Sequence, residues 1–249
     1  MFTLITTYYD NPKLLESFVR DNTGVPVIVV DDGSPTIPAL SVLKSMEAKN
    51  VTLFRVSEDL GFNSHGCRNL AMQQSRTEWN MLVDIDYKIH NMGRVSDDLL
   101  DIDPTTPWFF PVIEFNGSAV TRVSINDFVV TRDTYWKAGG YDTEFTGMHQ
   151  GDRMFIKRML GDMDPRGVNP LILTGGCMLE EMRSAKMALV RVEEWGDVAK
   201  EVVDHVAGTF RYSPGIARLV DTTTREIRDR WLRGVPSDPV PFKWEQQVW

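Results

Sequence analysis

Two apolar segments of this chain end in acidic turns, and this pattern limits the possible folds more than any other in the sequence. Residues 26–30 (PVIVV) form a continuous apolar run, which is typical of a strand covered on both faces. The run stops at DDGSP (31–35), and a second apolar strand, 79–83, stops at DID (84–86). Ligands of parallel sheets bind beyond the carboxyl ends of the strands. The two acidic turns are therefore candidate parts of one binding site.

Predicted strands and helices alternate through the first half of the chain. A strand over 2–6 precedes a helix that begins at Asn11-Pro12, where asparagine can cap the helix and proline fits its first turn. Further segments continue the alternation: helix 37–48, strand 51–56, helix 65–75 and strand 79–83. This order predicts an α/β fold with a mostly parallel, doubly wound sheet flanked by helices.

The second half of the chain is predicted to be less regular. It contains expected strands at 108–115, 119–130 and 170–173, and expected helices at 132–138 and 152–160. From about residue 180 the pattern becomes helical, with Trp195, Val198, Val202 and Val206 on one apolar face. We therefore expect one α/β domain at 1–178 and a mainly helical C-terminal extension at 179–249.

Composition narrows the class of protein. The 249 residues are 42% hydrophobic, as in ordinary globular domains, and the net charge of −8 disfavours nonspecific binding to nucleic acid. Two cysteines, Cys67 and Cys177, predict reduced thiols in a cytoplasmic compartment. The sequence shows neither a signal peptide nor the roughly 18 apolar residues of a membrane span. We expect a cytoplasmic protein without a transmembrane segment.

The acidic turns suggest a metal and a nucleotide. Asp84 and Asp86, two apart on an extended segment, point the same way and favour a divalent cation such as Mg²⁺ or Mn²⁺. A solvated acidic turn is the alternative. Asp31 or Asp32 offers a carboxylate to a uracil N–H or a ribose hydroxyl, and the alternative is an aspartate that caps the next helix.

Two further segments add charged groups. In GFNSHGCRN (61–69) a glycine-containing loop enters a helix that carries Arg68, an arrangement suited to a diphosphate. In the other segment, GGYD (139–142) is followed by Gly151 and Asp152 at the start of a helix. If Asp152 is partly buried near a metal site it can act as a general base. The alternative is an acid favoured only by the helix dipole.

Taken in order, these segments resemble family 2 glycosyltransferases of the GT-A fold. VVDDGSP resembles their first acidic turn, and LVDIDY resembles their metal-binding Asp-x-Asp. DFVVTRDTYWKAGGYDTEFTG resembles their strand, short helix and Gly-Gly-aromatic-Asp segment. Residues 58–75 resemble their Asn-x-Gly…Ala-Arg-Asn segment, with a longer loop. The resemblance covers roughly residues 2–176 and implies that the domain at 1–178 binds a nucleotide sugar and catalyses its transfer.

The resemblance implies roles for residues that match the family's donor site. Thr6 and Tyr8 would line the nucleotide pocket. Either Asp31 or Asp32 would contact the uracil or the ribose, and the sequence leaves the choice open. Arg68 would approach the diphosphate or the nucleoside.

The resemblance also implies the metal ligands and the catalytic base. Asp84 would contact the ribose or the metal, Asp86 would bind the metal directly, and Asp152 would be the base. His205 is a candidate third metal ligand, although it lies on a predicted helical face. Gly151 stands where the family often has an acid, so the base assignment depends on Asp152 alone.

These assignments predict a metal-dependent, inverting glycosyltransferase that uses Mn²⁺ or Mg²⁺. It would move a sugar from a UDP-sugar to a hydroxyl of an unidentified acceptor. One alternative is a sugar-phosphate nucleotidyltransferase, which the absence of glycine from the loop 7–12 disfavours; another is a noncatalytic nucleotide-sugar-binding module. The C-terminal helices are expected to pack on the sheet edge, with cover for the acceptor site or a homodimer contact as alternatives.

Overall fold

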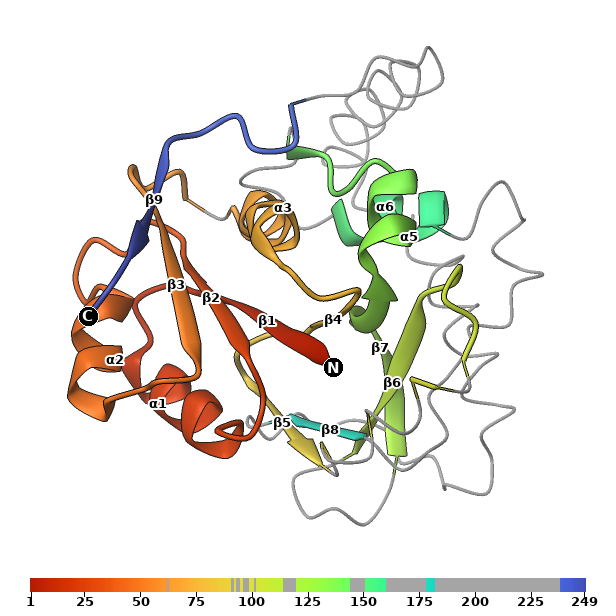
Figure 1. Cartoon of the computed structure of the whole chain (residues 1–249), viewed down its shortest axis with the longest axis horizontal. Coiled ribbons are helices and arrows are strands. Elements are labelled where there is room, and N and C mark those ends of the chain that lie inside the picture. The colour runs from red at the N-terminus through yellow and green to blue at the C-terminus, as the bar shows by residue number, and fades with distance from the viewer. Residues whose placement is uncertain are drawn as a thin grey trace, which may run out of the picture.

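The computed structural model describes residues 1–61, 63–90, 92, 95, 99–100, 102–113, 120–143, 151–159, 178–181 and 238–249. Within these residues one mixed sheet of nine strands has the order β5-β8-β6-β7-β4-β1-β2-β3-β9. Helices cover both faces of the sheet (Figure 1). The predicted α/β fold is confirmed.

Four neighbouring strands form the parallel part of the sheet. They are β4 (Trp79–Leu82), β1 (Phe2–Tyr8), β2 (Val27–Asp31) and β3 (Val51–Val56). Each pairs in parallel with its neighbour. Their carboxyl ends consequently meet at one edge of the sheet, as the doubly wound pattern predicts.

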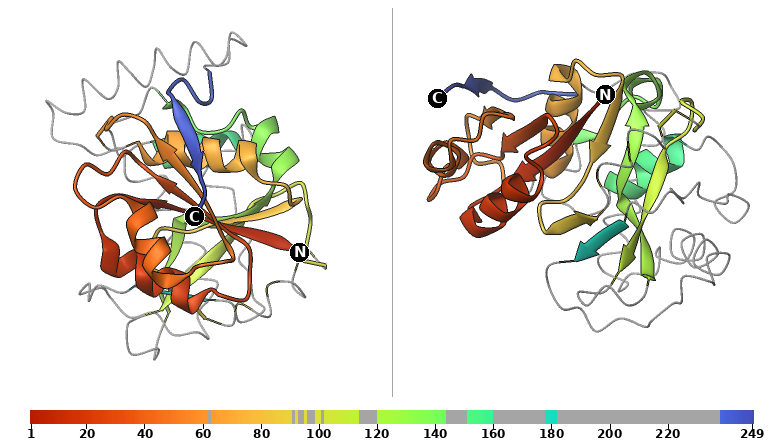
Figure 2. Two further views of the ribbon diagram at one scale, coloured as in Figure 1. Left: turned by 60° about the vertical axis from the view of Figure 1, so that its left-hand side comes forward. Right: turned by 60° about the horizontal axis from the view of Figure 1, so that its bottom comes forward.

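The helices of the first half lie on opposite faces of this sheet (Figures 1 and 2). On one face α1 (Pro12–Asp21) and α2 (Ala39–Met46) pack against Leu4 and Val29, and on the other α3 (Ser64–Gln74) packs against Ile5 and Val30. Consecutive strand residues point to opposite faces, so two apolar cores form, one on each side. The expected cap is also present, because the Asn11 side chain accepts a hydrogen bond from the Leu14 amide.

The flanking strands join the sheet mostly in the antiparallel sense. β7 (Val120–Thr131) pairs with β4 and with β6 (Trp108–Ile113), so the predicted strand pair is confirmed. Beyond them β5 (Tyr87–His90) and β8 (Met178–Glu181) form a pair that the sequence did not predict. These strands have four residues each, too few to give a clear alternation. The strand expected at 170–173 lies outside the described residues.

Two short helices follow β7 on the face that α3 covers. α5 (Arg132–Lys137) and α6 (Gly151–Met159) match the helices predicted there. Phe155 of α6 joins the same apolar core as Leu70 and Met72 of α3. The helix that begins with Gly151 and Asp152 is thereby packed beside the helix that carries Arg68.

The C-terminal segment returns to the sheet. β9 (Trp244–Gln247) pairs antiparallel with β3, and Trp244 packs edge-on against Phe54 with ring centroids 5.6 Å apart. Both β8 and β9 fall largely within the segment 179–249, and the sequence predicted neither of these two strands. Residues 182–237, which include the apolar face 195–206, lie outside the described part of the chain.

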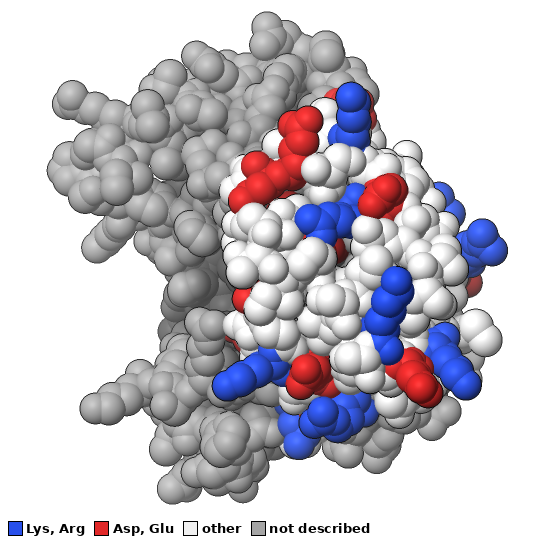
Figure 3. Space-filling view, turned by 90° about the vertical axis from the view of Figure 1, so that its left-hand side faces the viewer, with Lys and Arg blue, Asp and Glu red and all other residues white. Residues whose placement is uncertain are grey.

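The structure shows where charged side chains and one of the two cysteines lie. On the face that carries α2 and β9, basic and acidic side chains are interspersed (Figure 3). Cys67 is buried and free, and Cys177 lies outside the described residues. Among the helices that the structure describes, none is long and apolar enough to cross a membrane.

Candidate active site

A cavity of about 480 Å³ lies at the carboxyl ends of the parallel strands, where the sequence predicts the site. Residues from separate parts of the chain line it: Thr7, Tyr8, Tyr9, Asn11, Leu14, Asp32, Ser64, Arg68, Asp84, Ile85, Asp86, Asn126 and Asp152. This lining set contains four carboxylates and a single guanidinium. Among the predicted site residues, five charged ones line the cavity together with Tyr8.

Arg68 lies at the centre of the charged groups. Its Nη2 donates to Asp84 Oδ1 over 2.6 Å, and its Nη1 lies 3.4 Å from Asp152 Oδ1. Nη1 also donates to the Tyr141 hydroxyl and to the Asn126 carbonyl, at 2.8 and 2.7 Å. Burial lowers the pKa of Arg68, but Tyr141, Asp84 and Asp152 outweigh it and raise the pKa well above its usual value. The buried guanidinium therefore stays cationic.

Asp84 and Asp86 lie in the turn between β4 and β5. The Asp84 amide donates to the Asp127 carboxylate on β7 over 2.6 Å, which fixes the start of the turn. Burial raises the pKa of Asp84, and so do the carboxylates of Asp152 and Asp86, although Arg68 opposes them. The pocket thus holds more negative charge than Arg68 neutralises, a condition that favours a bound cation.

The carboxylates of Asp84 and Asp86 fit a divalent ion whose remaining ligands come from water and from the phosphates of a substrate. Within the described residues no group of three or more His, Cys, Asp or Glu side chains is placed to hold a metal. Magnesium sites, however, commonly use one or two carboxylates and complete their shell with water and substrate phosphates. Asp84 and Asp86 satisfy this requirement. His205, the predicted third ligand, lies outside the described residues.

Asp152 lies in the first turn of α6, and its side chain is 15% exposed. His65 Nε2 lies 3.6 Å from Asp152 Oδ2, on the opposite oxygen from Arg68. Burial raises the pKa of Asp152, but His65, Arg68 and Tyr141 together lower it below its usual value. Asp152 is consequently an ionised carboxylate at neutral pH.

The structure distinguishes the two aspartates of the first acidic turn. Asp31 is fully buried, and its carboxylate accepts from the Ser34 and Ala39 amides, both at 2.8 Å, and contacts Arg55 at 3.3 Å. Asp31 therefore holds the turn and the start of α2. Asp32 lines the cavity instead, with its Oδ2 accepting from the Asn63 amide over 2.9 Å.

The two residues predicted from β1 also differ. Tyr8 lines the cavity, and its hydroxyl donates to the Ile37 carbonyl over 2.6 Å. Burial, Asp31 and Asp10 raise the pKa of Tyr8 to about 12. Thr6 is not among the lining residues and is buried within the strand, because the cavity begins one residue later, at Thr7.

Solved structures with this fold include a protein bound to UDP and a mannosyltransferase bound to GDP-Man. The chain matches S. aureus TarS 1–349 in complex with UDP with a TM-score of 0.56 and 17% identity, over 82% of this chain and 65% of that one. It matches the mannosyltransferase PcManGT from Pyrobaculum calidifontis, in complex with GDP-Man and Mn²⁺, with a TM-score of 0.53 and 14% identity, over 94% and 82%.

The chain has the fold of a GT-A glycosyltransferase. The fold class predicted from the sequence is confirmed by these structures. The chain spans 60% of a second structure of TarS 1–349 and 42% of a further TarS structure. No protein-family model matches the chain, and no curated protein matches its sequence significantly.

Within this GT-A fold, Asn69 of the Arg-Asn segment has a structural role. Asn69 Nδ2 donates to the carbonyls of Tyr141 and Pro239, and Asn69 Oδ1 accepts from the Tyr141 amide and the Tyr135 hydroxyl. Position 140, which lies beside Asn69, requires glycine. The φ of Gly140 is +69°, and an added Cβ would lie 2.8 Å from Asn69 Oδ1. Asn69 thereby joins α3 to the loop that carries Tyr141.

Several residues of the site were not predicted from the sequence. Tyr141 lay in the predicted GGYD loop without a role, yet its hydroxyl accepts from Arg68. His65 lay in the predicted Arg-Asn segment, and Asn126 lay in a predicted strand. No local spacing distinguishes these two residues from ordinary core or strand positions. Only the packing of α3, β7 and α6 brings them together.

Proposed function

We propose that this chain is a metal-dependent glycosyltransferase that moves a sugar from a UDP-sugar to an acceptor hydroxyl with inversion. The observation that carries the proposal is the meeting of Arg68, Asp84, Asp86 and Asp152 in one cavity at the carboxyl ends of the parallel strands. The fold shared with TarS and PcManGT supports it. The division into a catalytic domain at 1–178 and an extension at 179–249 is part of the same proposal.

The charge of the cavity is the argument for a metal. Four carboxylates and one guanidinium line it, so a diphosphate entering alone would be repelled. Asp84 and Asp86 would hold Mn²⁺ or Mg²⁺, which would neutralise the diphosphate as its charge grows. That PcManGT was solved with GDP-Man and Mn²⁺ is consistent with this requirement.

Asp152 would act as the base in a single displacement. Its carboxylate takes the proton of the acceptor hydroxyl while the acceptor oxygen bonds to the anomeric carbon and the bond from that carbon to the diphosphate breaks. Arg68, in the same cavity, stabilises the negative charge of the departing diphosphate. Its fixed position costs no reorganisation during the reaction.

Tyr8 and Asp32 would contact the nucleoside. Tyr8 ends β1 and Asp32 directly follows β2, and both line the cavity. The Asp32 carboxylate is an acceptor for a uracil N–H or a ribose hydroxyl. The UDP bound by TarS supports uridine as the nucleoside. Guanosine, the nucleoside of the GDP-Man bound by PcManGT, is the alternative that a binding test must compare with uridine.

The decisive experiment is a screen of nucleotide sugars for thermal stabilisation and for transfer. UDP-sugars are expected to raise the melting temperature only when Mn²⁺ or Mg²⁺ is present, and to release UDP when acceptors are added. Stabilisation without any UDP release, even by slow hydrolysis, would favour a binding module. Pyrophosphate release from UTP and a sugar phosphate would identify a nucleotidyltransferase instead.

A further inference from the structure

We propose that His65 is a positioning residue that holds the carboxylate of Asp152 in the orientation needed to accept the acceptor's proton. The inference rests on the proposed function, because it assumes that Asp152 is the base. It adds a residue for which the sequence predicted no role.

The two oxygens of Asp152 face two different side chains of α3. His65 Nε2 lies 3.6 Å from Oδ2, and Arg68 Nη1 lies 3.4 Å from Oδ1. Residues three apart share one face of a helix, so α3 presents both nitrogens to the same carboxylate. Each carboxylate oxygen has two acceptor sites, which leaves capacity for a proton from the cavity.

The imidazole of His65 is itself fixed by packing. Its side chain is fully buried, and its ring stacks on Tyr141 with centroids 5.1 Å apart and an interplanar angle of 28°. Tyr141 in turn packs on Phe155 of α6 with centroids 4.3 Å apart. One aromatic stack thus joins the helix of His65 to the helix of Asp152, which restricts how the carboxylate can turn.

The distance of 3.6 Å is slightly longer than a hydrogen bond. Catalytic contacts in structures without substrate are often long and tighten when substrate binds. The imidazole and the carboxylate are both largely buried, so a contact between them lowers the free-energy cost of burying two polar groups. A histidine that served only to fill the core would be replaceable by an apolar side chain of similar size.

Three substitutions test this role. His65→Gln keeps an N–H donor near the position of Nε2, His65→Asn is one methylene too short, and His65→Met keeps volume without a donor. We expect kcat to fall roughly 10- to 100-fold in the Asn and Met variants, because a misplaced base loses its near-attack geometry. The KM for the donor should stay unchanged, and the Gln variant should recover most of the wild-type kcat.

Melting temperatures and UDP affinity, measured on the same proteins, report on folding and on the donor site. The Gln and Asn variants form a matched pair, so a general loss of packing affects both. Equal kcat values in these two variants, or an increase of donor KM in place of the fall in kcat, would overturn the role of His65. Absence of transfer by the wild-type protein would instead overturn the proposed function.

Discussion

Arg68 and Asp84 form a partly buried ion pair, with Nη2 2.6 Å from Oδ1, at the point where α3 meets the end of β4. The same guanidinium reaches Asp152 through Nη1, so one side chain links a candidate metal ligand to the candidate base. The planar fork of arginine makes this double contact possible. The proposed donor, metal and base sites are therefore neighbours.

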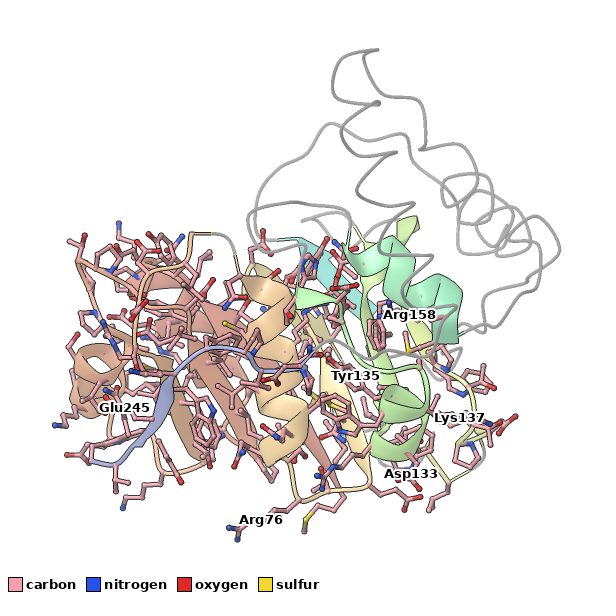
Figure 4. All side chains as sticks on the ribbon, turned by 90° about the horizontal axis from the view of Figure 1, so that it is seen from above. Arg76, Asp133, Tyr135, Lys137, Arg158 and Glu245 are labelled. Atoms are coloured by element: carbon pink, nitrogen blue, oxygen red, sulfur yellow. The ribbon has the colours of Figure 1, made fainter. Side chains whose placement is uncertain are left out.

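Arg68→Lys should lower kcat/KM roughly 100-fold, because lysine keeps the charge but cannot reproduce the two-pronged contact. Steady-state transfer assays would measure this loss. The matched control is Arg76→Lys, which alters an exposed arginine that extends outward from the domain (Figure 4). Transfer rates that are the same in these two variants would show that the contact has no catalytic role.

Asp152→Asn should lower transfer by roughly 100- to 10,000-fold, since the amide cannot accept the proton of the acceptor hydroxyl. Binding of UDP, measured by calorimetry, should remain close to that of the wild type. Asp133→Asn is the control, because Asp133 also lies in the first turn of a helix but is exposed. Normal turnover of the Asp152→Asn variant would place the base elsewhere.

Removal of the metal should abolish stabilisation by the donor. At a donor concentration of 100 times Kd, binding would stabilise the wild type by about 2.7 kcal/mol. We expect this gain with Mn²⁺, its loss with a chelator, and its absence at all Mn²⁺ concentrations in Asp86→Asn. Full stabilisation by the same donor, in either that variant or the chelated wild type, would argue against a metal-bridged diphosphate.

Burial of the Tyr8 hydroxyl should make the free energy of unfolding fall at alkaline pH. Its pKa in the folded protein is about 12, above the ordinary value of 10, so the folded state keeps the proton that the unfolded state loses. The stabilisation is complete below about pH 10 and disappears as pH rises towards 12. Urea unfolding of wild type and Tyr8→Phe at about pH 7 and about pH 11 should show a difference that shrinks at the higher pH. A constant difference would contradict this.

Trp244→Ala should lower the free energy of unfolding by roughly 1–3 kcal/mol, because the indole packs on Phe54 where β9 pairs with β3. Glu245→Ala is the control, since this exposed neighbour points to the other side of the strand (Figure 4). Chemical denaturation would compare them. Equal loss in both variants would mean that strand pairing, and not the aromatic contact, holds the C-terminal segment.

The amino-acid sequence alone predicts the parallel strands, the acidic turns at their ends and the helix that carries Arg68. These features are local, because strand burial, turn residues and helix caps depend on neighbours in the chain. Gly33 illustrates this: its φ of +72° is one that glycine readily adopts within the DDGSP turn.

Two features depend on how distant elements pack: which aspartate of the first turn faces the cavity, and the contact between His65 and Asp152. Neighbouring residues point in different directions, so Asp31 is bound by the backbone of its own turn while Asp32 reaches the cavity. The pairing of β9 with β3 and the contact between α3 and α6 join segments that are distant in the chain. Such contacts leave no periodicity in the sequence, since they depend on packing between elements and not on spacing within one.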